Sequence, residues 1–448
     1  MEELSAPASI GVETYRARRD RLMRSLPADS AVLIPAGQLQ PRSGDADYPF
    51  RQHSDFHYLC GFPEPQAWLV LLPGRQAGAA VLLCRGRDPD AETWTGRRLG
   101  PRRAVSDYGL DEARELDECD AALDELLDGR RSLYLPLDDE RSRTLALATR
   151  RRLVARERDG AVAPSRLVDV TELIHDQRLI KSDAEIAIMA HAGAISARAH
   201  RRAMAELRPG MFEYQLQAHI EHEFLLHGAR SPAYDTIVGG GANACVLHYC
   251  DNAAVLRDGE LVLIDAGAEY ALYAGDITRT LPVGGRFREP QRQLYEIVLG
   301  AQQRALRAVR PGVRLRDIHD GVVADLSAGL VALGLLEGPV ERVIAEGHYK
   351  RFFPHGTSHW LGLDVHDAGA YRVDGESRAL APGMVLTVEP GLYIPDDPDI
   401  PTPWQGIGIR IEDDVVVTAE GSRVLTADVP KSVAEIEALM AIGRERTP

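Results

Sequence analysis

The chain has 448 residues, of which 45% are hydrophobic, a composition typical of a globular protein with two or three domains. Its net charge of -15 at pH 7 argues against nucleic acid or an anionic membrane as the main partner. The five cysteines are scattered, the N-terminal stretch MEELSAPASIGVETY lacks an apolar signal segment, and no run of about 18 apolar residues occurs, so we expect a cytoplasmic protein with reduced thiols.

The first third of the chain predicts an α/β domain, which we bound at residues 1–180. Residues 42–62 are rich in polar and aromatic residues and predict a loop leading into a strand, and residues 160–167 are interpreted as a linker. Hydrophobic periodicity predicts helices over 14–27, 115–129 and 140–158, and strands over 31–37, 67–74, 79–86 and 132–138.

Trp94 lies in the segment ETWTGRRLG and has no apolar neighbours in the sequence. A tryptophan in such a segment either packs against its own domain or contacts a ligand or a partner chain. The sequence leaves both possibilities open.

Residues 181–448 contain two helices followed by strands, and then the same arrangement again. Ser182 and Glu185 have the spacing of a capping box at the start of a long helix. The tripeptide Arg-Pro-Gly separates the two helices of each repeat, at 208–210 and at 310–312. This repetition predicts a duplicated unit with pseudo-two-fold symmetry. The expected helices are 183–207, 212–227, 289–309 and 315–334, with strands over 231–283 and 352–418 and a last helix after Ser432.

The stretch LVLIDAGAEYALYAGDITRT, residues 261–280, predicts a β-hairpin with a carboxylate on each arm. Asp265 ends the first strand and Asp276 begins the return strand, with a short turn region between them. Burial of two like charges is unfavourable unless a cation neutralises them. The alternative is that both aspartates face solvent.

A second pair of strands, MVLTVEPG (384–391) and GIGIRIEDD (406–414), presents Glu389 and Glu412 on its strand faces. If the two halves face each other, four carboxylates converge, and such a cluster requires cations. Arg410 lies on the same face as Glu412 and could hold a ligand carboxylate, although a surface position is the alternative. Gly406 and Gly408 are expected to leave that face flat and open.

Three histidines, His355, His359 and His366, fall within the segment FFPHGTSHWLGLDVH, and His359 is the natural nitrogen ligand. Four carboxylates and one imidazole suit two divalent ions of the manganese, cobalt or iron type. Two such ions about 3.5–4 Å apart can share a hydroxide and polarise a carbonyl group, which is the chemistry of amide or ester hydrolysis.

The segments IDAGAEYALYAGDITRT, HGTSHWLGLDVHD, LTVEPGLY and GIGIRIEDD resemble the pita-bread metallopeptidases, which include methionine aminopeptidase, prolidase and aminopeptidase P, with creatinase as a metal-free relative. DYPFRQHSDFHYLCGF and WTGRRLG extend the resemblance to the aminopeptidase P branch, over nearly the whole chain. The resemblance implies an N-terminal α/β domain followed by a pseudo-two-fold pita-bread α+β catalytic domain over 181–448.

The resemblance also assigns roles to residues. Asp265 would be a terminal ligand of one metal, Asp276 and Glu412 would bridge both metals, and His359 and Glu389 would complete the shell of the second. The other roles implied are contact with the scissile bond or the substrate amine (His248), contact with the substrate carbonyl or the proline side (His366), lining of the pocket (His355), and support or proton relay (Tyr371 and Arg410).

The activity implied is removal of an N-terminal residue that precedes proline, with two divalent ions, usually manganese. Proline's tertiary amide has no N–H group, so a dedicated pocket is physically sensible. The resemblance further implies a homo-oligomer, a dimer or a tetramer, in which Trp94 would reach a neighbouring subunit's substrate pocket. The alternatives are a prolidase, which cleaves only Xaa-Pro dipeptides, and a non-catalytic pita-bread binding module.

Overall fold

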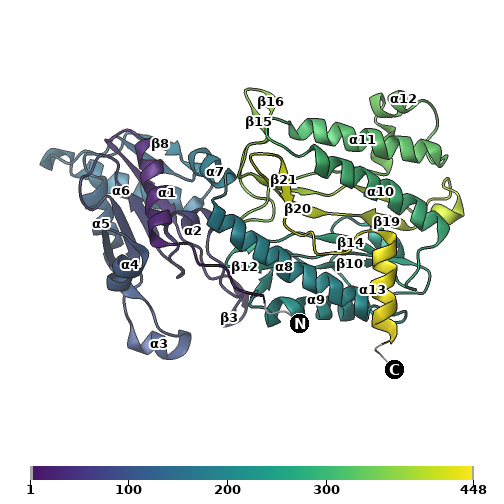
Figure 1. Cartoon of the computed structure of the whole chain (residues 1–448). Coiled ribbons are helices and arrows are strands. Elements are labelled where there is room, and N and C mark those ends of the chain that lie inside the picture. The colour runs from purple at the N-terminus through teal and green to yellow at the C-terminus, as the bar shows by residue number, and fades with distance from the viewer. Residues whose placement is uncertain (1–3, 446–448) are drawn as a thin grey trace. The chain divides into compact units, whose positions relative to one another are not determined.

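The computed structural model describes residues 4–445 and divides into two units, each with its own hydrophobic core (Figure 1). One unit spans residues 9–178, and the other runs from Leu179 onward and includes residues 4–8. Within the described residues, no helix combines the length and the apolar character needed to cross a membrane. All five cysteines are free thiols.

The first unit is built on a six-stranded mixed sheet with the strand order β6-β5-β4-β1-β7-β8. The central strand β1 pairs antiparallel with β4 and parallel with β7. The predicted strands at 31–37, 67–74, 79–86 and 132–138 are therefore confirmed. The sheet comprises β1 (Ser30–Pro35), β4 (Trp68–Leu71), β5 (Ala80–Cys84), β6 (Glu112–Glu115), β7 (Ser132–Leu135) and β8 (Arg166–Asp169).

Helices accompany this sheet, and most of their predicted bounds hold within a few residues. The helix predicted from residue 115 begins later, because residues 112–115 pair with β5 as the edge strand β6. The helices are α1 (Val12–Arg24), α2 (Ser54–Cys60), α3 (Pro89–Thr95), α4 (Gly100–Tyr108), α5 (Cys119–Leu127), α6 (Glu140–Ala155) and α7 (Thr171–Leu179).

Two predictions for this unit are wrong. The predicted loop and strand at 42–62 is a small hairpin, β2 (Pro41–Ser43) with β3 (Ala46–Asp47), followed by the helix α2. Phe56, Tyr58 and Leu59 are all buried, so α2 lacks the polar face that marks a helical period in sequence. The predicted linker at 160–167 runs into the sheet, because β8 pairs with β7.

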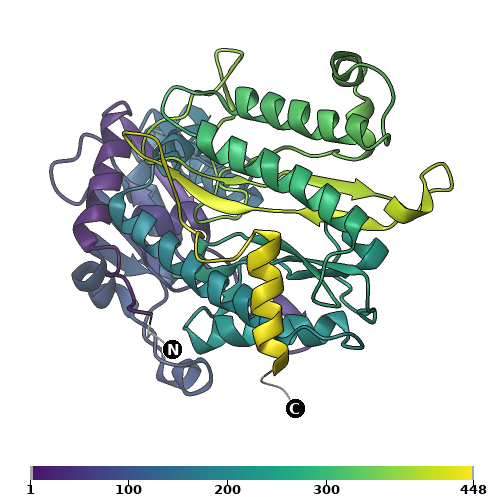
Figure 2. The ribbon, with the colours of Figure 1, turned by 45° about the vertical axis from the view of Figure 1, so that its right-hand side comes forward.

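The second unit repeats one arrangement of helices and strands (Figures 1 and 2). The predicted capping box is present, with the Ser182 hydroxyl accepting from the Glu185 N–H group and the Glu185 carboxylate accepting from Ser182. The helices of the first half are α8 (Asp183–Glu206) and α9 (Glu213–Leu226), those of the second half are α10 (Glu289–Ala308), α11 (Leu315–Ala332) and α12 (Val340–Ala345), and α13 (Val433–Glu445) ends the described chain.

The two Arg-Pro-Gly joints make the same backbone contact. Gly210 has a φ of 90° and donates its N–H to the carbonyl of Leu256 over 2.8 Å. Gly312 has a φ of 85° and donates to the carbonyl of Leu380, also over 2.8 Å. This left-handed conformation favours glycine in both places. The matching contacts confirm that the unit is duplicated.

The predicted hairpin around Asp265 is confirmed, since β11 pairs antiparallel with β14 and Asp265 lies opposite Thr278. A second small hairpin, β12–β13, replaces the predicted short turn region. The first-half strands are β9 (Ser231–Pro232), β10 (Ile237–Gly240), β11 (Leu261–Asp265), β12 (Ala268–Tyr270), β13 (Tyr273–Ala274) and β14 (Thr278–Pro282).

In the second half, β17 pairs with β20 and β18 pairs with β19. Residues 352–371 lie outside the strands, contrary to the prediction, and only an isolated bridge joins Trp360 to Leu386. Hydrogen bonds to β17 fix this irregular segment, as described below. The strands are β15 (Arg372–Val373), β16 (Glu376–Ser377), β17 (Val385–Val388), β18 (Gly391–Ile394), β19 (Ile407–Arg410), β20 (Asp413–Val417) and β21 (Ser422–Val424).

Candidate active site

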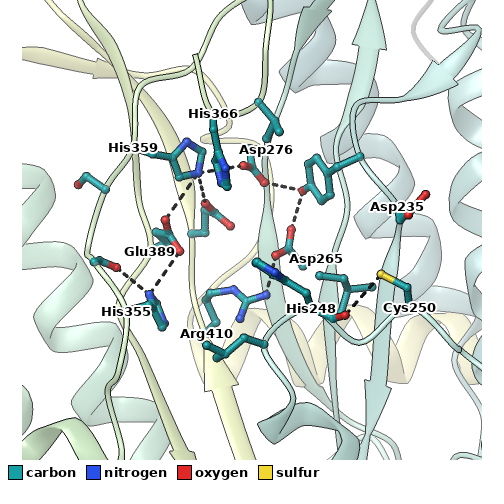
Figure 3. A pocket seen from close by; sticks show the side chains of 17 residues that line it. Asp235, His248, Cys250, Asp265, Asp276, His355, His359, His366, Glu389 and Arg410 are labelled. Carbon is teal, nitrogen blue, oxygen red and sulfur yellow. Dashed lines mark hydrogen bonds and ion pairs between the residues drawn. The ribbon is translucent and has the colours of Figure 1, made fainter. Parts of the chain in front are cut away.

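A cavity of about 530 Å³ lies in the second unit (Figure 3). Its lining includes all five of the predicted metal ligands and four further residues predicted for the site. These residues are Asp265, Asp276, His359, Glu389 and Glu412, with His248, His355, His366 and Arg410.

The four carboxylates occupy the ends of strands from both halves of the unit. Asp265 ends β11 and Asp276 precedes β14, whereas Glu389 follows β17 and Glu412 lies between β19 and β20. The two glutamates therefore lie just beyond strands rather than on strand faces, as the sequence had suggested. Because the strands end around one cavity, their terminal side chains reach a common point.

The segment that carries His359 is fixed by backbone hydrogen bonds to β17. Thr387 donates its N–H to the carbonyl of His359 over 3.0 Å, and Glu389 donates to the carbonyl of Thr357 over 2.9 Å. The Nδ1 atom of His359 lies 3.0 Å from the carbonyl oxygen of Trp360, so Nδ1 carries the hydrogen of the neutral ring. The lone pair of Nε2 then faces the carboxylates, as in a metal-binding imidazole.

Three ligand atoms, one each from Asp276, His359 and Glu412, lie within 4.8 Å of one another. His359 Nε2 is 3.4 Å from Asp276 Oδ2, 3.6 Å from Glu389 Oε1 and 4.0 Å from Glu412 Oε1. Figure 3 shows His359 directed toward Asp276 and Glu389. Oxygen and imidazole donors at this spacing suit a hard or borderline divalent cation.

The carboxylates lack enough positive charge to stay ionised by themselves. Burial raises the pKa of Glu412, and the negative charges of Asp276 and Glu389 raise it further. Burial also raises the pKa of Glu389 to about 7, against the positive charges of His359 and Arg410. Burial lowers the pKa of His359, but its hydrogen bond to Asp276 and the charge of Glu389 outweigh burial and give a pKa of about 9. Without another cation, the cluster therefore takes up protons.

Arg410 is buried and acts within the site rather than at the surface. Its Nη2 atom donates to Asp265 Oδ2 over 2.6 Å, its Nη1 to the Tyr393 hydroxyl over 2.9 Å, and its Nε to the Thr278 hydroxyl over 3.1 Å. The guanidinium group thus holds one predicted ligand, Asp265, through Oδ2 and makes no hydrogen bond to its Oδ1.

The expectation that Gly406 and Gly408 leave an open strand face is wrong. A Cβ atom at Gly408 would lie 2.2 Å from the carbonyl oxygen of Ala244, in the 3₁₀ helix Gly241–Cys245. Glycine at this position permits close backbone packing rather than substrate access.

Tyr234 is a site residue that the sequence reasoning missed. Its hydroxyl lies 2.5 Å from Asp265 Oδ1 and 2.5 Å from Asp276 Oδ1. One hydroxyl has only one hydrogen to donate, so it cannot satisfy both carboxylates. The second contact is therefore unfavourable unless a proton or a cation lies between the oxygens.

Arg279 was also missed, and it joins the two halves behind the carboxylate cluster. It is fully buried and donates through Nη1 to the carbonyl oxygens of Thr278, over 2.9 Å, and of Glu412, over 2.5 Å. Its Nη2 atom forms an ion pair with Asp413 over 2.7 Å. One side chain therefore holds the backbone next to Asp276 and the backbone of Glu412.

Of the other predicted site residues, some line the cavity and others do not. The rings of His359 and His366 meet edge to face with centroids 4.4 Å apart, and His355 Nε2 is 2.8 Å from the Tyr393 hydroxyl. Tyr371 is not part of the cavity lining. Trp94 belongs to α3 in the first unit, and 87% of its surface is exposed.

Comparison with models of known protein families identifies the family of this chain. Residues 187–419 match the family model of metallopeptidase family M24, and residues 15–134 match the aminopeptidase P N-terminal domain. The chain belongs to metallopeptidase family M24. The predicted resemblance to pita-bread metallopeptidases and the predicted fold class are therefore confirmed.

Individual members of the M24 family match the chain over almost its whole length. The Xaa-Pro aminopeptidase of Escherichia coli K12 is 47% identical over 98% of this chain and 100% of its own. The structure of Pseudomonas aeruginosa aminopeptidase PepP matches with a TM-score of 0.96 and 47% identity, covering 98% of this chain and 99% of that one. A zinc-substituted E. coli aminopeptidase P in complex with product matches with a TM-score of 0.95 and 47% identity, covering 98% and 100%.

Membership of metallopeptidase family M24 implies bound metal ions, and the carboxylate cluster is suited to hold them. In the cavity lining, Arg410 and His359 offset part of the charge of Asp265, Asp276, Glu389 and Glu412. With a metal bound, the neutral imidazole of His359 would present the unshared pair of Nε2 toward the same oxygens. Bound cations would supply the missing positive charge and allow all four carboxylates to ionise.

Proposed function

We propose that this chain is an Xaa-Pro aminopeptidase, which hydrolyses the bond between an N-terminal residue and a following proline. The observation that carries the proposal is a complete set of four carboxylates and one imidazole around a cavity of peptide-binding size, in an M24 chain. The match to the Xaa-Pro aminopeptidase of E. coli over the whole of both chains supports the same activity.

The proposed cofactor is a pair of divalent cations, with manganese as the physiological ion. Asp265 would be a terminal ligand of one ion, Asp276 and Glu412 would bridge the two ions, and His359 and Glu389 would complete the coordination of the second ion. The spacing of Asp276, His359 and Glu412 supports this assignment. When bound, such ions supply a Lewis acid and a water molecule of lowered pKa.

The protein's own groups bind and orient the peptide. We assign His248 to the region of the scissile bond, His366 to the substrate carbonyl or the proline side, and His355 to the wall beside Tyr393. Arg410 holds Asp265 in place, and Tyr371 supports the segment between His359 and His366 or relays a proton.

The proposed protein consists of a domain at 1–180, an α/β unit for assembly and substrate gating, and a catalytic domain at 181–448. It acts in the cytoplasm as a homo-oligomer, a dimer or a tetramer, without nucleic acid as a partner. In that assembly Trp94 contacts the peptide that occupies the substrate pocket of a neighbouring subunit. The high exposure of Trp94 supports this contact, because a large exposed aromatic side chain is typical of a binding surface.

Three peptides test the activity on protein loaded with Mn²⁺: Leu-Pro-Ala, Leu-Pro and Leu-Ala-Ala. We expect release of leucine from Leu-Pro-Ala and none from Leu-Ala-Ala. Cleavage of Leu-Pro alone would identify a prolidase. No cleavage by protein that retains its metal would identify a binding module and contradict the proposal.

A further inference from the structure

Asp235 is a cavity-lining carboxylate that the proposed catalytic machinery does not use. It is exposed to solvent and lines the same cavity as the metal-binding groups. In Figure 3, Asp235 and Cys250 lie on one side of the cavity, away from His359 and Glu389. This side of the cavity wall therefore carries a negative charge of its own.

The other acidic side chains of the cavity lining are engaged elsewhere. Asp265 pairs with Arg410, and Asp276, Glu389 and Glu412 surround His359. Among the described residues, Asp235 has neither an ion pair nor a hydrogen bond to its carboxylate. A positively charged ligand group can therefore reach it without displacing a protein cation.

The two residues that flank Asp235 in the chain are anchored by hydrogen bonds. On one side, the hydroxyl of Tyr234 contacts Asp265 and Asp276. On the other side, Asn252 donates its side-chain N–H to the carbonyl of Thr236 over 2.7 Å and is itself almost fully buried. Because the flanking residues are anchored, binding has to order only the side chain of Asp235 and not the surrounding segment.

The negative charge of Asp235 affects the neighbouring Cys250 thiol in the cavity wall. Partial burial raises the pKa of the Cys250 thiol, and the negative charges of Asp235 and Asp251 raise it further. The thiol therefore stays neutral, and Asp235 contributes to the negative potential that a ligand meets beside Cys250.

On the basis of the proposed function, we propose that Asp235 selects peptides whose first residue is lysine or arginine. The α-amino nitrogen of such a peptide is only two bonds from the carbonyl carbon under attack, so it must stay beside the metal-binding cluster. Asp235 is not part of that cluster. A long basic side chain can extend from the reacting residue to a carboxylate elsewhere on the wall, whereas a short or neutral one cannot pair with it.

The test compares kcat/KM for Lys-Pro-Ala with that for norleucine-Pro-Ala, which has a side chain of similar length without the ammonium group. We expect the holoenzyme to favour the lysine peptide and Asp235→Asn to reduce that preference by about twofold to fivefold, the range of an exposed ion pair. Asp251→Asn is the matched control, because Asp251 is a neighbouring exposed aspartate outside the cavity lining. Its preference should change by less than about twofold.

Ala-Pro-Lys and Ala-Pro-norleucine separate the first residue from the third. A preference for Ala-Pro-Lys that disappears in Asp235→Asn would overturn the assignment to the first residue. An unchanged Lys-Pro-Ala preference in Asp235→Asn, or an equal loss in Asp251→Asn, would overturn the role of Asp235. Failure to cleave both Lys-Pro-Ala and norleucine-Pro-Ala would instead refute the aminopeptidase activity on which the inference rests.

Discussion

The backbone N–H of Trp360 donates a hydrogen bond to the hydroxyl of Tyr371 over 3.1 Å, and the two rings stack with centroids 5.4 Å apart. Trp360 directly follows His359 in the chain. Tyr371 therefore holds the backbone beside a proposed metal ligand, although it does not line the cavity. Its hydroxyl keeps its own proton available for a second partner.

The variant Tyr371→Phe keeps the stacked ring and removes the hydroxyl. We expect kcat to fall by at least about tenfold, within the usual range for loss of a proton-transfer or positioning group. Metal content, measured by elemental analysis, should not change. Unaltered kcat would exclude a proton relay through Tyr371, and loss of metal would show that the hydroxyl matters for His359 instead.

Removal of metal should abolish hydrolysis, because the protein's own cations cannot balance four clustered carboxylates, three of them buried. Dialysis against a chelator should therefore eliminate release of leucine from Leu-Pro-Ala. Addition of Mn²⁺ should restore it, and titration of the metal-free protein should give two bound ions per chain. Full turnover by protein shown to be free of metal would contradict a metal-dependent mechanism.

Loss of a proposed bridging ligand should have the largest effect of any single substitution, since it would disturb both proposed ions. Asp276→Asn and Glu412→Gln should each lower kcat by more than about a thousandfold and reduce metal occupancy. Both substitutions preserve side-chain volume, so elemental analysis reports on the lost charge. Near-normal activity with two ions bound would show that these residues are not the bridges.

His248→Ala and His366→Ala provide the contrast. Neither histidine is a proposed ligand, so metal content should remain intact while kcat falls by about a hundredfold to ten-thousandfold. A variant that loses metal would identify that histidine as a ligand.

Trp94→Ala tests the proposed contact with a neighbouring subunit. The exposed indole is expected to bound the peptide there, so its removal should raise KM several-fold while metal content stays constant. Leu147→Ala, at another exposed apolar residue of the same unit, is the control and should leave KM unchanged. A fully active monomer in sedimentation velocity would rule out the contact.

Stability should fall as the pH drops from about 6.5 to 4, in part because of His200. This histidine is buried, and burial lowers its pKa to about 4, whereas the unfolded value is near 6.5. The unfolded chain then binds more protons than the folded chain in this window, which disfavours folding by up to about 3 kcal/mol at the acidic end.

The variant His200→Gln keeps an N–H group for the carbonyl of Ala266, which His200 Nε2 contacts over 3.0 Å, but does not titrate. Its melting temperature should therefore depend less on pH between 7 and 5 than that of the unmutated protein. His348→Gln, at an exposed histidine, should not differ from the unmutated protein in this respect. Equal pH dependence in both variants would exclude His200 as a source of the acid sensitivity.

The sequence predicted the residues whose position follows from local periodicity. Alternation along 261–265 placed Asp265 at a strand end, and Ser182 and Glu185 marked the start of α8, because strand alternation and helix capping depend on nearby residues only. The chemistry of the residues predicted His359 and the two glutamates as metal ligands, and the family resemblance added the expected division of these ligands between two ions.

Tyr234 and Arg279 could not be predicted in this way. Tyr234 lies in an irregular bend and meets Asp276 across 42 residues of sequence, and Arg279 meets the carbonyl of Glu412 across 133. Such contacts depend on how the two halves fold together. Similarly, the close approach at Gly408 depends on Ala244, so the glycine pattern alone suggested an open face.

The presence of both halves in one chain affects how metal binding depends on protein concentration. Asp265 and Asp276 come from the first half, and His359, Glu389 and Glu412 come from the second. If the halves were separate molecules, every ion would have to recruit two of them, and binding would weaken as the protein was diluted. Joining them in one chain fixes the effective concentration of one half around the other. The affinity of a single chain for metal should therefore be independent of how much protein is present.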